Sequence, residues 1–427
     1  MVATLPTTRT RSFNWPLIAI LCSIAALNYC DRLAIAAVFP LLRADLGASD
    51  VMLGTIASAF LWSYAIGSPV VGWIADHRSR TRIIVISLAS WSLITIATGV
   101  TRTTNQLIAM RFLLGLAECA YIPAAVGLLA DHHGPEHRGR AISMHTAGLG
   151  IGAVAGSTLA GFLGQRYGWR STFIILGAAG ILLALFATWV LRGKDVAVSR
   201  PKSTVLSETP EKKGILRALL RVPSYWVLLL QSMFLSIGIW LFLNWLPLYF
   251  TESFGMSLAG AGFYGAALLE FPLLFGVVAG GYLSDTVARR NSAGRMLIQM
   301  ICYVLGAVLL LVFTRNSGFG LVAAAVLGFS LLRSFAVANE TPLLCDLLPP
   351  RQRSTAIGLM NSANTFAGGV GVFAAGVLKS NLGLRTIFAG VSGILLTAAL
   401  INAFGYFFLL PRDLKRRADK TAGELRV

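Results

Sequence analysis

Asp31 and Arg32 stand side by side in the first long apolar run of the chain, within the stretch 28–32, Asn-Tyr-Cys-Asp-Arg. A charged side chain at membrane depth costs at least about 2.5 to 3.5 kcal/mol, so such residues normally face a protein interior or a water-filled path. A carboxyl group can take up and release a proton, and a guanidinium group can bind an anion. The adjacent acid and base therefore mark the first candidate functional site.

A second pair of charges, Arg111 and Glu118, lies in another apolar run. Seven residues make about two helical turns, so both side chains project from one helix face. We predict that these two groups and the pair in the first run line one cavity. In this hypothesis Asp31 and Glu118 exchange protons, while Arg32 and Arg111 supply positive charge for an anion. The alternative is a set of static salt bridges between the two spans, and Arg111 has the further alternative of snorkelling to the membrane surface.

Further polar residues interrupt the apolar runs of the second half of the chain. Glu340, Asn361 and Asn364 are predicted to hydrogen-bond substrate hydroxyls, because recognition of a hydroxylated substrate needs several donors and acceptors in an apolar pocket. Arg333 and Glu270 fit a structural ion pair at least as well as a substrate site. Four more side chains are candidates for the wall of the substrate site, although packing is the commoner role for aromatic residues in such helices: Tyr29, Asn244, Trp245 and Tyr249.

The composition indicates the class of protein. The chain has 427 residues, of which 56% are hydrophobic and 13% charged, with a mean hydropathy of +0.72. This is too apolar for a soluble globular protein of this length. The net charge of +18 does not indicate a nucleic-acid-binding protein, because the Lys and Arg residues separate hydrophobic stretches instead of gathering on one face. The five cysteines lack C-x-x-C spacing, so we expect free thiols, no disulfide framework and no metal site.

The apolar runs predict an all-α polytopic membrane protein with twelve transmembrane helices, each near the roughly 20 residues that cross a bilayer. Basic residues concentrate in the termini, in the central linker and in the loops after spans 2, 4, 8 and 10. By the positive-inside rule, both ends of the chain are predicted to be cytoplasmic. The predicted parts are an N-terminal half (1–191), a linker (192–224), a C-terminal half (225–410) and a basic tail (411–427). The predicted spans are 15–40, 52–75, 82–101, 105–130, 140–164, 171–191, 225–250, 260–284, 294–314, 318–345, 354–379 and 386–410.

An internal repeat supports the division into halves. At a constant offset of 215 residues, loop residues and glycines of the first half match those of the second. Glycine matches are common in such a composition, but Asp, Pro and Arg in register are not. We therefore predict two pseudo-symmetric six-helix halves related by duplication, which in transporters surround a midplane site and rock about it to give alternating access. The matched residues are Asp131, Pro135, Arg138, Gly168 and Arg170 with Asp346, Pro350, Arg353, Gly383 and Arg385.

The loop after the second span resembles the signature of the major facilitator superfamily, Gly-x-x-x-Asp-Arg-x-Gly-Arg-Arg. It runs from Gly72 to Arg82, with His77 and Ser79 departing from the family pattern, and a weaker copy begins at Gly281. The resemblance covers the whole chain and implies the major facilitator fold. It also implies a gate, in which the loop acid accepts from helix-end amides or from an arginine of the facing half; a solvated loop that only sets topology is the alternative. The predicted gating residues are Gly72, Asp76, Arg80, Asp285 and Arg289.

The charged motifs also resemble those of one subfamily, the anion:cation symporters, which include carriers of sugar acids. The matching motifs are Asn-Tyr-x-Asp-Arg in span 1 and Arg-x6-Glu in span 4. In that family the span 1 acid and the span 4 Glu act in proton coupling and the span 1 Arg binds the substrate carboxylate. The resemblance assigns these roles to Asp31, Glu118 and Arg32. The acids of the second half have no counterpart in the symporter pattern. The same two motifs also occur in spinster-like lysolipid transporters, whereas the stretch 355–364 favours the symporters.

Together these patterns predict a secondary active transporter that takes up a small organic anion with protons by alternating access. The expected anion is a sugar acid or another hydroxylated carboxylate, and the proton gradient replaces any cofactor. We expect a monomer in the lipid bilayer of a bacterial inner membrane, with no enzyme activity. Spinster-like transport of a lysolipid or amphiphile is the closest alternative. An integral membrane enzyme is the alternative of another class, for which the sequence offers only a loop cluster of histidines, His132, His133 and His137.

Overall fold

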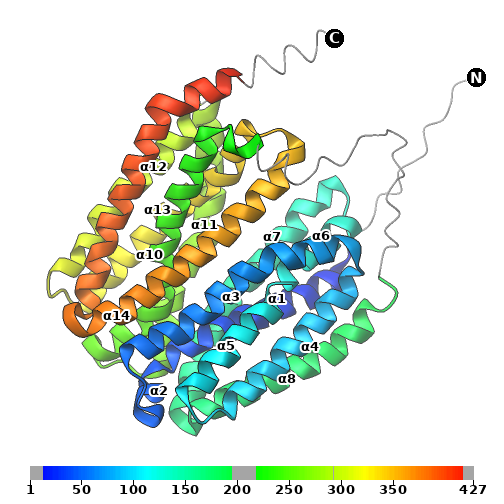
Figure 1. Cartoon of the computed structure of the whole chain (residues 1–427), viewed down its shortest axis with the longest axis vertical. Helices are drawn as coiled ribbons and strands as arrows, with labels where there is room; N and C mark the ends of the chain where they lie inside the picture. The colour runs from blue at the N-terminus through cyan, green and yellow to red at the C-terminus, as the bar shows by residue number, and fades with distance from the viewer. Residues whose placement is uncertain (1–12, 195–217, 292, 417–427) are drawn as a thin grey trace, which may run out of the picture.

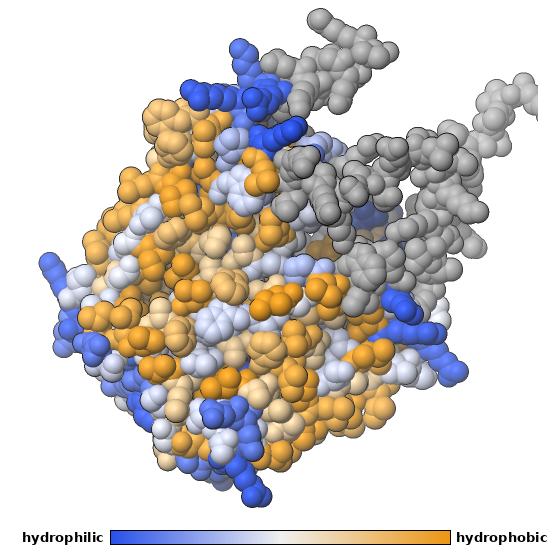
Figure 2. Space-filling model, viewed as in Figure 1, coloured by the Kyte–Doolittle hydropathy of each residue, from blue (hydrophilic) through white to orange (hydrophobic). Residues whose placement is uncertain are grey.

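The computed structural model describes residues 13–194, 218–291 and 293–416, apart from the side chains at 72–77, 135 and 351. The predicted linker and tail lie partly outside these residues. Within the described ranges the regular structure is helical, with no β-strand. Apolar side chains cover most of the face seen in Figure 2, and hydrophilic ones gather in patches at its edges. Phe275 and Trp189 are 75% and 72% exposed, as expected where the surroundings are lipid. The chain is a multi-pass membrane protein.

The helices of the first half begin and end at local sequence signals. Ser49 accepts a hydrogen bond from the amide of Met52, and Thr103 accepts one from the amide of Gln106. Both side chains satisfy an amide that lacks a partner in the first helical turn. The helices are α1 (Trp15–Ala37), α2 (Phe39–Leu46), α3 (Asp50–His77), α4 (Arg80–Gly99), α5 (Thr104–Glu118), α6 (Tyr121–His132), α7 (Pro135–Tyr167) and α8 (Trp169–Leu191).

The second half contains longer and less interrupted helices. Its α-helices are α10 (Pro223–Phe254), α11 (Leu258–Arg290), α12 (Gly294–Leu310), α13 (Phe319–Leu347) and α14 (Pro350–Phe404). A 3₁₀ helix (Leu311–Thr314) follows α12, and a π-helix (Gly405–Leu409) follows α14. Figure 1 shows α1 to α8, coloured blue to green, as one group of helices and α10 to α14, coloured green to red, as a second group beside it. Contact between the groups is mainly that of α3 with α14 and of α7 with α11.

The twelve predicted spans correspond to eleven continuous apolar segments among the described residues. The difference lies in α14, which contains the predicted span 354–379 and most of the predicted span 386–410. Gly383 interrupts this helix with a non-helical backbone (φ 72°, ψ 157°). Figure 1 shows the orange and red arms of α14 at an angle to each other. The segment 352–416 has 65 residues, long enough to cross a bilayer twice. Span 4 is likewise divided, into α5 and α6, by a break at residues 119–120.

The structure repeats specific features at the offset of 215 residues. Gly168 and Gly383 both have positive φ, 83° and 72°, which glycine adopts without steric cost. Arg80 forms an ion pair with Asp131 in the first half, and Arg295 lies 3.4 Å from Asp346 in the second. Both partners of this ion pair are therefore duplicated, which confirms the predicted pseudo-symmetry.

Candidate functional site

The centre of the site is a buried ion pair between α1 and α5. A terminal guanidinium nitrogen of Arg32 lies 3.1 Å from a carboxylate oxygen of Glu118, and the two side chains are 4% and 0% exposed. The same nitrogen donates to the side-chain oxygen of Asn28, one turn earlier on α1, at 3.3 Å. Gly156 of α7 allows close packing behind this part of α1, because a Cβ there would lie 2.3 Å from the Cα of Cys30. This ion pair between spans 1 and 4 corresponds to the alternative given for these charges, and the cavity lined by all four charged groups stays a prediction.

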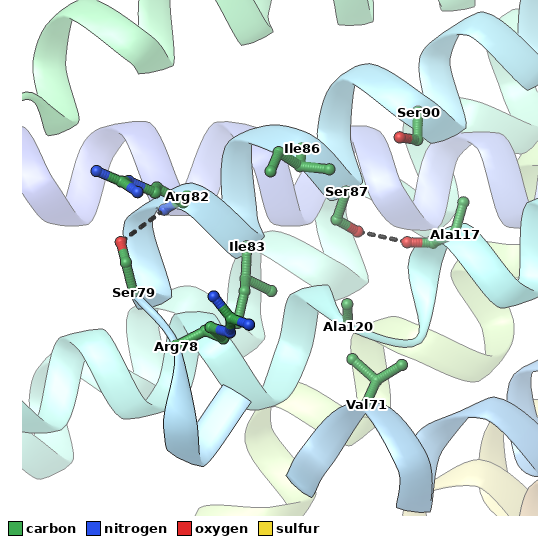
Figure 3. A pocket seen from close by; sticks show the side chains of 10 residues that line it. All are labelled: Val71, Arg78, Ser79, Arg82, Ile83, Ile86, Ser87, Ser90, Ala117 and Ala120. Atoms are coloured by element: carbon green, nitrogen blue, oxygen red, sulfur yellow. Dashed lines mark hydrogen bonds between the residues drawn. The ribbon is translucent and has the colours of Figure 1, made fainter. Parts of the chain in front are cut away.

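Glu118 occupies the point where α5 ends, next to the break in span 4. The hydroxyl of Ser87 on α4 donates to the carbonyl of Ala117 at 2.5 Å, which satisfies a carbonyl at the end of a helix. Figure 3 shows this hydrogen bond at the side of a cavity of about 510 Å³ that also includes Arg78 and Arg82. This hydrogen bond therefore restrains the backbone immediately before Glu118.

Aromatic rings surround the guanidinium group of Arg32. Its central carbon lies 4.7 Å from the ring centroid of Tyr29, 4.6 Å from that of Tyr64 and 5.0 Å from that of Phe60. These distances are typical of cation–π contacts. Tyr29 was a predicted site residue, whereas Tyr64 and Phe60 were not. Their spacing of four residues on span 2 was a signal for a shared helix face, but it did not indicate which span they would face.

Arg111 forms hydrogen bonds with the backbone of α1. It is 1% exposed and donates to the backbone carbonyls of Asp31 and Arg32, at 3.3 and 3.2 Å. The side chain therefore does not snorkel, and it fastens α5 to the backbone of α1 at the site. Anion binding by Arg111 stays a prediction, and its hydrogen bonds favour a positioning role.

Asp31 is fully buried and faces away from the guanidinium of its neighbour. The hydroxyl of Thr95 on α4 lies 3.5 Å from one carboxylate oxygen, and the other oxygen has no hydrogen-bond partner among the described residues. Successive residues on a helix point roughly 100° apart, so Asp31 faces α4 while Arg32 faces α5. A buried carboxyl group without a paired cation has its lowest free energy in the neutral form. This suits a group that holds a proton.

The second half contributes another buried pair, between α11 and α13. Arg333 lies 4.0 Å from Glu270, with side-chain exposures of 10% and 7%, and donates to the carbonyl of Leu269 at 3.4 Å. This pair approaches the first half, because a Cβ at Gly150 of α7 would lie 3.7 Å from a carboxylate oxygen of Glu270.

The other predicted substrate-binding residues have separate surroundings. The side-chain oxygen of Asn364 accepts from Ser232 at 2.9 Å, Asn361 is exposed and Glu340 is half-buried. Asn244 donates to the carbonyl of Trp240 on its own helix. The indole of Trp245 donates to the carbonyl of Val372, and Tyr249 belongs to a cluster of rings with Phe313 and Phe388. These contacts fit packing of the second half, and a substrate role for these residues stays a prediction.

Comparison with known proteins decides the family. The family model described as Major Facilitator Superfamily matches residues 21–339 and 294–426. The chain belongs to this superfamily. Its arrangement of helices is similar to the crystal structure of a bacterial homologue of the human lysosomal transporter Spinster in an inward-facing, unoccupied conformation. That likeness has a TM-score of 0.76 and 21% identity, and it covers 96% of this chain and 98% of the other, so it concerns the fold alone.

Two relatives carry names that concern small anions. The chain is 26% identical to a probable sulfoacetate transporter, SauU, of Cupriavidus necator, over 96% of this chain and 97% of the relative. It is 28% identical to a probable galactarate/D-glucarate transporter, GudP, of Bacillus subtilis, over 67% of this chain and 68% of the relative. Both relatives align with most of this superfamily member.

The gate loops of this superfamily member have ion pairs of their own. Arg80 contacts Asp131 and donates to the carbonyl of Gly127 at 2.8 Å. In the second copy, Asp285 accepts from Arg295 at 3.0 Å, and Arg289 is exposed. Gly72 lies in α3, but the side chains at 72–77, including that of Asp76, are outside the described residues. The gating roles stay predictions.

The loop histidines, which were the basis of the enzyme alternative, contact helix ends. The Nδ1 atoms of His132 and His133 each lie 2.9 Å from a backbone carbonyl of α6. The Nε2 atom of His133 accepts from the amide of Asn14 at 3.3 Å. These contacts connect the start of α1 to the end of α6.

A network of four charges joins the two halves at the end of the bundle where α2 lies, here called the α2 end. Arg43 and Asp50 come from the first half, and Glu252 and Lys379 come from the second. Arg43 lies 2.9 Å from Glu252, and Lys379 lies 3.0 Å from Glu252 and 3.3 Å from Asp50. Arg43 also pairs with Asp50. The described conformation is therefore held closed at the α2 end.

Replacing Lys379 with methionine is expected to favour opening of the α2 end. The change removes both ion pairs of this side chain, and each partly exposed pair contributes up to about 1 kcal/mol, so the balance of conformations should shift several-fold. Spin labels on the exposed residues Ala44 and Ser380, one in each half, would report a larger population at long distance. Lys379→Arg should keep the original distribution. An unchanged distribution in Lys379→Met would show that the network does not hold this end closed.

Proposed function

We propose that this chain is a proton-coupled transporter that takes up a small organic anion. The observation that carries the proposal is the buried pair of Arg32 and Glu118. Around it, the side-chain nitrogen of Asn28, the Nε atom of Arg32 and one oxygen of Glu118 are buried without hydrogen-bond partners among the described residues. Unpaired buried polar atoms are costly, and a polar ligand would supply the missing partners.

The pair offers a simple exchange of partners. An incoming carboxylate or sulfonate binds the guanidinium of Arg32 and displaces the carboxylate of Glu118. The displaced group is then buried without a counter-charge, so its protonated form has the lower free energy. Loss of the anion restores the ion pair and releases the proton. Binding of the anion and binding of the proton thus favour each other, which is the requirement for symport.

The names of the two relatives support an organic acid as the substrate, because sulfoacetate, galactarate and D-glucarate are all small anions. With both termini in the cytoplasm of a bacterial inner membrane, the α2 end faces outward. The described conformation is then closed to the outside, and transport requires the charge network at that end to separate. The protein would work as a monomer, and its two halves would move relative to each other about the site between them.

Uptake into proteoliposomes with an imposed pH gradient tests the function. Purified full-length protein is expected to accumulate at least one member of a panel of sugar acids, dicarboxylates and sulfonates when the compartment on the side of entry is acidic. Collapse of the gradient with a protonophore should abolish accumulation. Movement of lysolipids in the absence of any anion transport would instead support the amphiphile alternative, which the span 1 and span 4 motifs also fit.

A further inference from the structure

The cavity beside the break in span 4 has no part in the exchange just described. Its volume of about 510 Å³ lies within the roughly 300 to 1,000 Å³ that is typical of ligand-binding pockets. Its lining comes from the end of α3, from the first half of α4 and from the point where α5 ends and α6 begins. Three elements of the first half thus form a space whose occupant the transport mechanism does not supply.

Two arginines, Arg78 and Arg82, lie at one end of this cavity (Figure 3). Both side chains are exposed, and neither guanidinium has an ion pair or a hydrogen bond among the residues whose side chains the structure describes. Arg80 differs from them, because its guanidinium contacts Asp131 and the carbonyl of Gly127. The cavity therefore has two cationic groups at this end and, in the described part of its lining, no acid to balance them.

The rest of the lining is mostly apolar and extends along α4 into the membrane. Ile83 and Ile86 follow the arginines on this helix, and Ile86 is 64% exposed, so the cavity opens toward lipid. From Arg82 to Ser90 the helix rises about 12 Å, which is close to half of the roughly 30 Å thickness of the hydrocarbon core. The cavity is thus cationic at the membrane surface and apolar through much of one leaflet.

We infer that this cavity binds one molecule of an anionic phospholipid. The phosphate of the lipid contacts Arg78 and Arg82, and one acyl chain lies along Ile83 and Ile86. A guanidinium group binds phosphate with two parallel hydrogen bonds, and basic pockets between transmembrane helices are suited to acidic head groups. The acyl chain covers isoleucine side chains that the protein itself leaves exposed. Binding at this cavity is independent of which anion the protein transports.

The lining favours an anionic lipid over two other occupants. A soluble phosphate compound would contact the arginines but would leave the apolar wall uncovered. A zwitterionic phospholipid has the same phosphate and acyl chains, but its own cationic group is repelled by the two guanidinium groups. Only a lipid with a net negative head group matches both ends of the cavity.

The far end of the cavity adjoins the acid to which we assign proton coupling. Ala117 and Ala120 both line the cavity, and they flank Glu118 in the chain. Ser87, which is also in the lining, donates to the carbonyl of Ala117. An acyl chain that reaches this end packs against the break in span 4, so the bound lipid restrains the backbone that carries Glu118.

Matched lipids test the inference on the purified full-length protein. Native mass spectrometry of the protein, titrated with lipid in detergent micelles, measures how much of each lipid is bound. Phosphatidylglycerol is expected to bind at least about tenfold more tightly than phosphatidylcholine with the same acyl chains, a ratio equivalent to about 1.4 kcal/mol. Glycerol phosphate, a soluble compound with the same phosphate group, should bind far more weakly than the lipid because it has no acyl chain.

Variants of the arginines test the contact with the head group. Arg78→Gln and Arg82→Gln should each reduce the preference for phosphatidylglycerol several-fold, and the double variant should remove it. Both side chains are exposed, so these changes leave the packing of the helices intact. Arg138→Gln, the same change at an exposed arginine near the start of α7, should keep the wild-type preference.

A substitution at the apolar end tests the contact with the acyl chain. Ser90→Phe places a ring in the cavity and keeps both arginines, so it should abolish the tight binding of phosphatidylglycerol. Leu93→Phe is the matched control, because Leu93 is 59% exposed on the same helix and is not among the lining residues. This control should bind the lipid as the wild type does.

Four results would overturn the inference. Equal affinity of the wild-type protein for phosphatidylglycerol and phosphatidylcholine would show that the head group is not recognised. Equally tight binding of glycerol phosphate would indicate a site for soluble phosphate compounds. An equal loss of preference in Arg138→Gln and Arg82→Gln would indicate a general effect of surface charge. Unchanged binding in Ser90→Phe would place the lipid outside the cavity.

Discussion

Glu118→Gln is expected to abolish proton-driven accumulation of the anion while retaining counterflow exchange. The amide oxygen of glutamine can accept from Arg32 as the carboxylate does at 3.1 Å, so the contact between α1 and α5 is preserved. The amide does not titrate, so the change in protonation that couples the two gradients is lost. Proteoliposomes measure both activities: accumulation under an imposed pH gradient should fall to the level of the protonophore control, and exchange of labelled for unlabelled substrate should continue.

A matched change elsewhere excludes a general effect of replacing an acid. Glu136 is exposed in the first turn of α7, and Glu136→Gln should leave accumulation at the wild-type level. Equal loss of accumulation and exchange in Glu118→Gln would mean that the acid serves structure or substrate binding and not coupling. The expected separation of the two activities is therefore the decisive feature.

Much of the architecture followed from hydrophobic length and from the repeat. Runs of about 20 apolar residues can satisfy their backbone polar groups in lipid only as helices, so the spans were predictable one by one. The duplicated glycines, Gly168 and Gly383, were visible in the sequence, and their positive φ explains why glycine is present at both places. The merging of the last two spans into one helix with a kink depends on local geometry that hydropathy does not report.

The charged residues of the candidate site could be named from the sequence, whereas the rings of Tyr64 and Phe60 and most of the contacts could not. A buried charge without a partner is strongly destabilising, so Arg32 and Glu118 were each expected to form an ion pair. In the structure they pair with each other. The direction of Asp31 depends on how α1 is rotated against α4. Arg111 donates to backbone carbonyl groups. Every residue has such a group, so the sequence does not indicate which carbonyls an arginine will contact. The direction of Asp31 and the contacts of Arg111 both depend on how the helices pack. For these two residues the sequence could therefore give only alternative roles.

Aromatic residues show the same limit. Tyr64 lies over Arg32, whereas Tyr249 and Trp245 contact other rings and a backbone carbonyl. All three are aromatic side chains in apolar helices. An aromatic ring can pack against another ring or lie against a cation, and the residue type is the same in both cases. Only the position of a cation in space distinguishes the two uses.

Arg32→Lys is expected to weaken binding of the anion about 10- to 100-fold. A hydrogen bond to a charged group contributes about 1.5 to 3 kcal/mol, and a carboxylate can accept two parallel bonds from a guanidinium but not from an ammonium. The planar group also lies over the rings of Tyr29 and Tyr64, a contact that a lysine keeps only in part. Calorimetric titration of the purified variant with the transported anion measures the loss.

The effect of the charge can be separated from that of the planar fork. Lysine keeps the positive charge beside Glu118, so Arg32→Lys tests the geometry of recognition, and Arg32→Gln adds loss of the charge and should weaken binding further. Arg102→Lys, at an exposed arginine of the same half, should bind as the wild type does. Unchanged affinity in Arg32→Lys would show that the anion does not contact the guanidinium, and the exchange of partners between substrate and Glu118 would then have no physical basis.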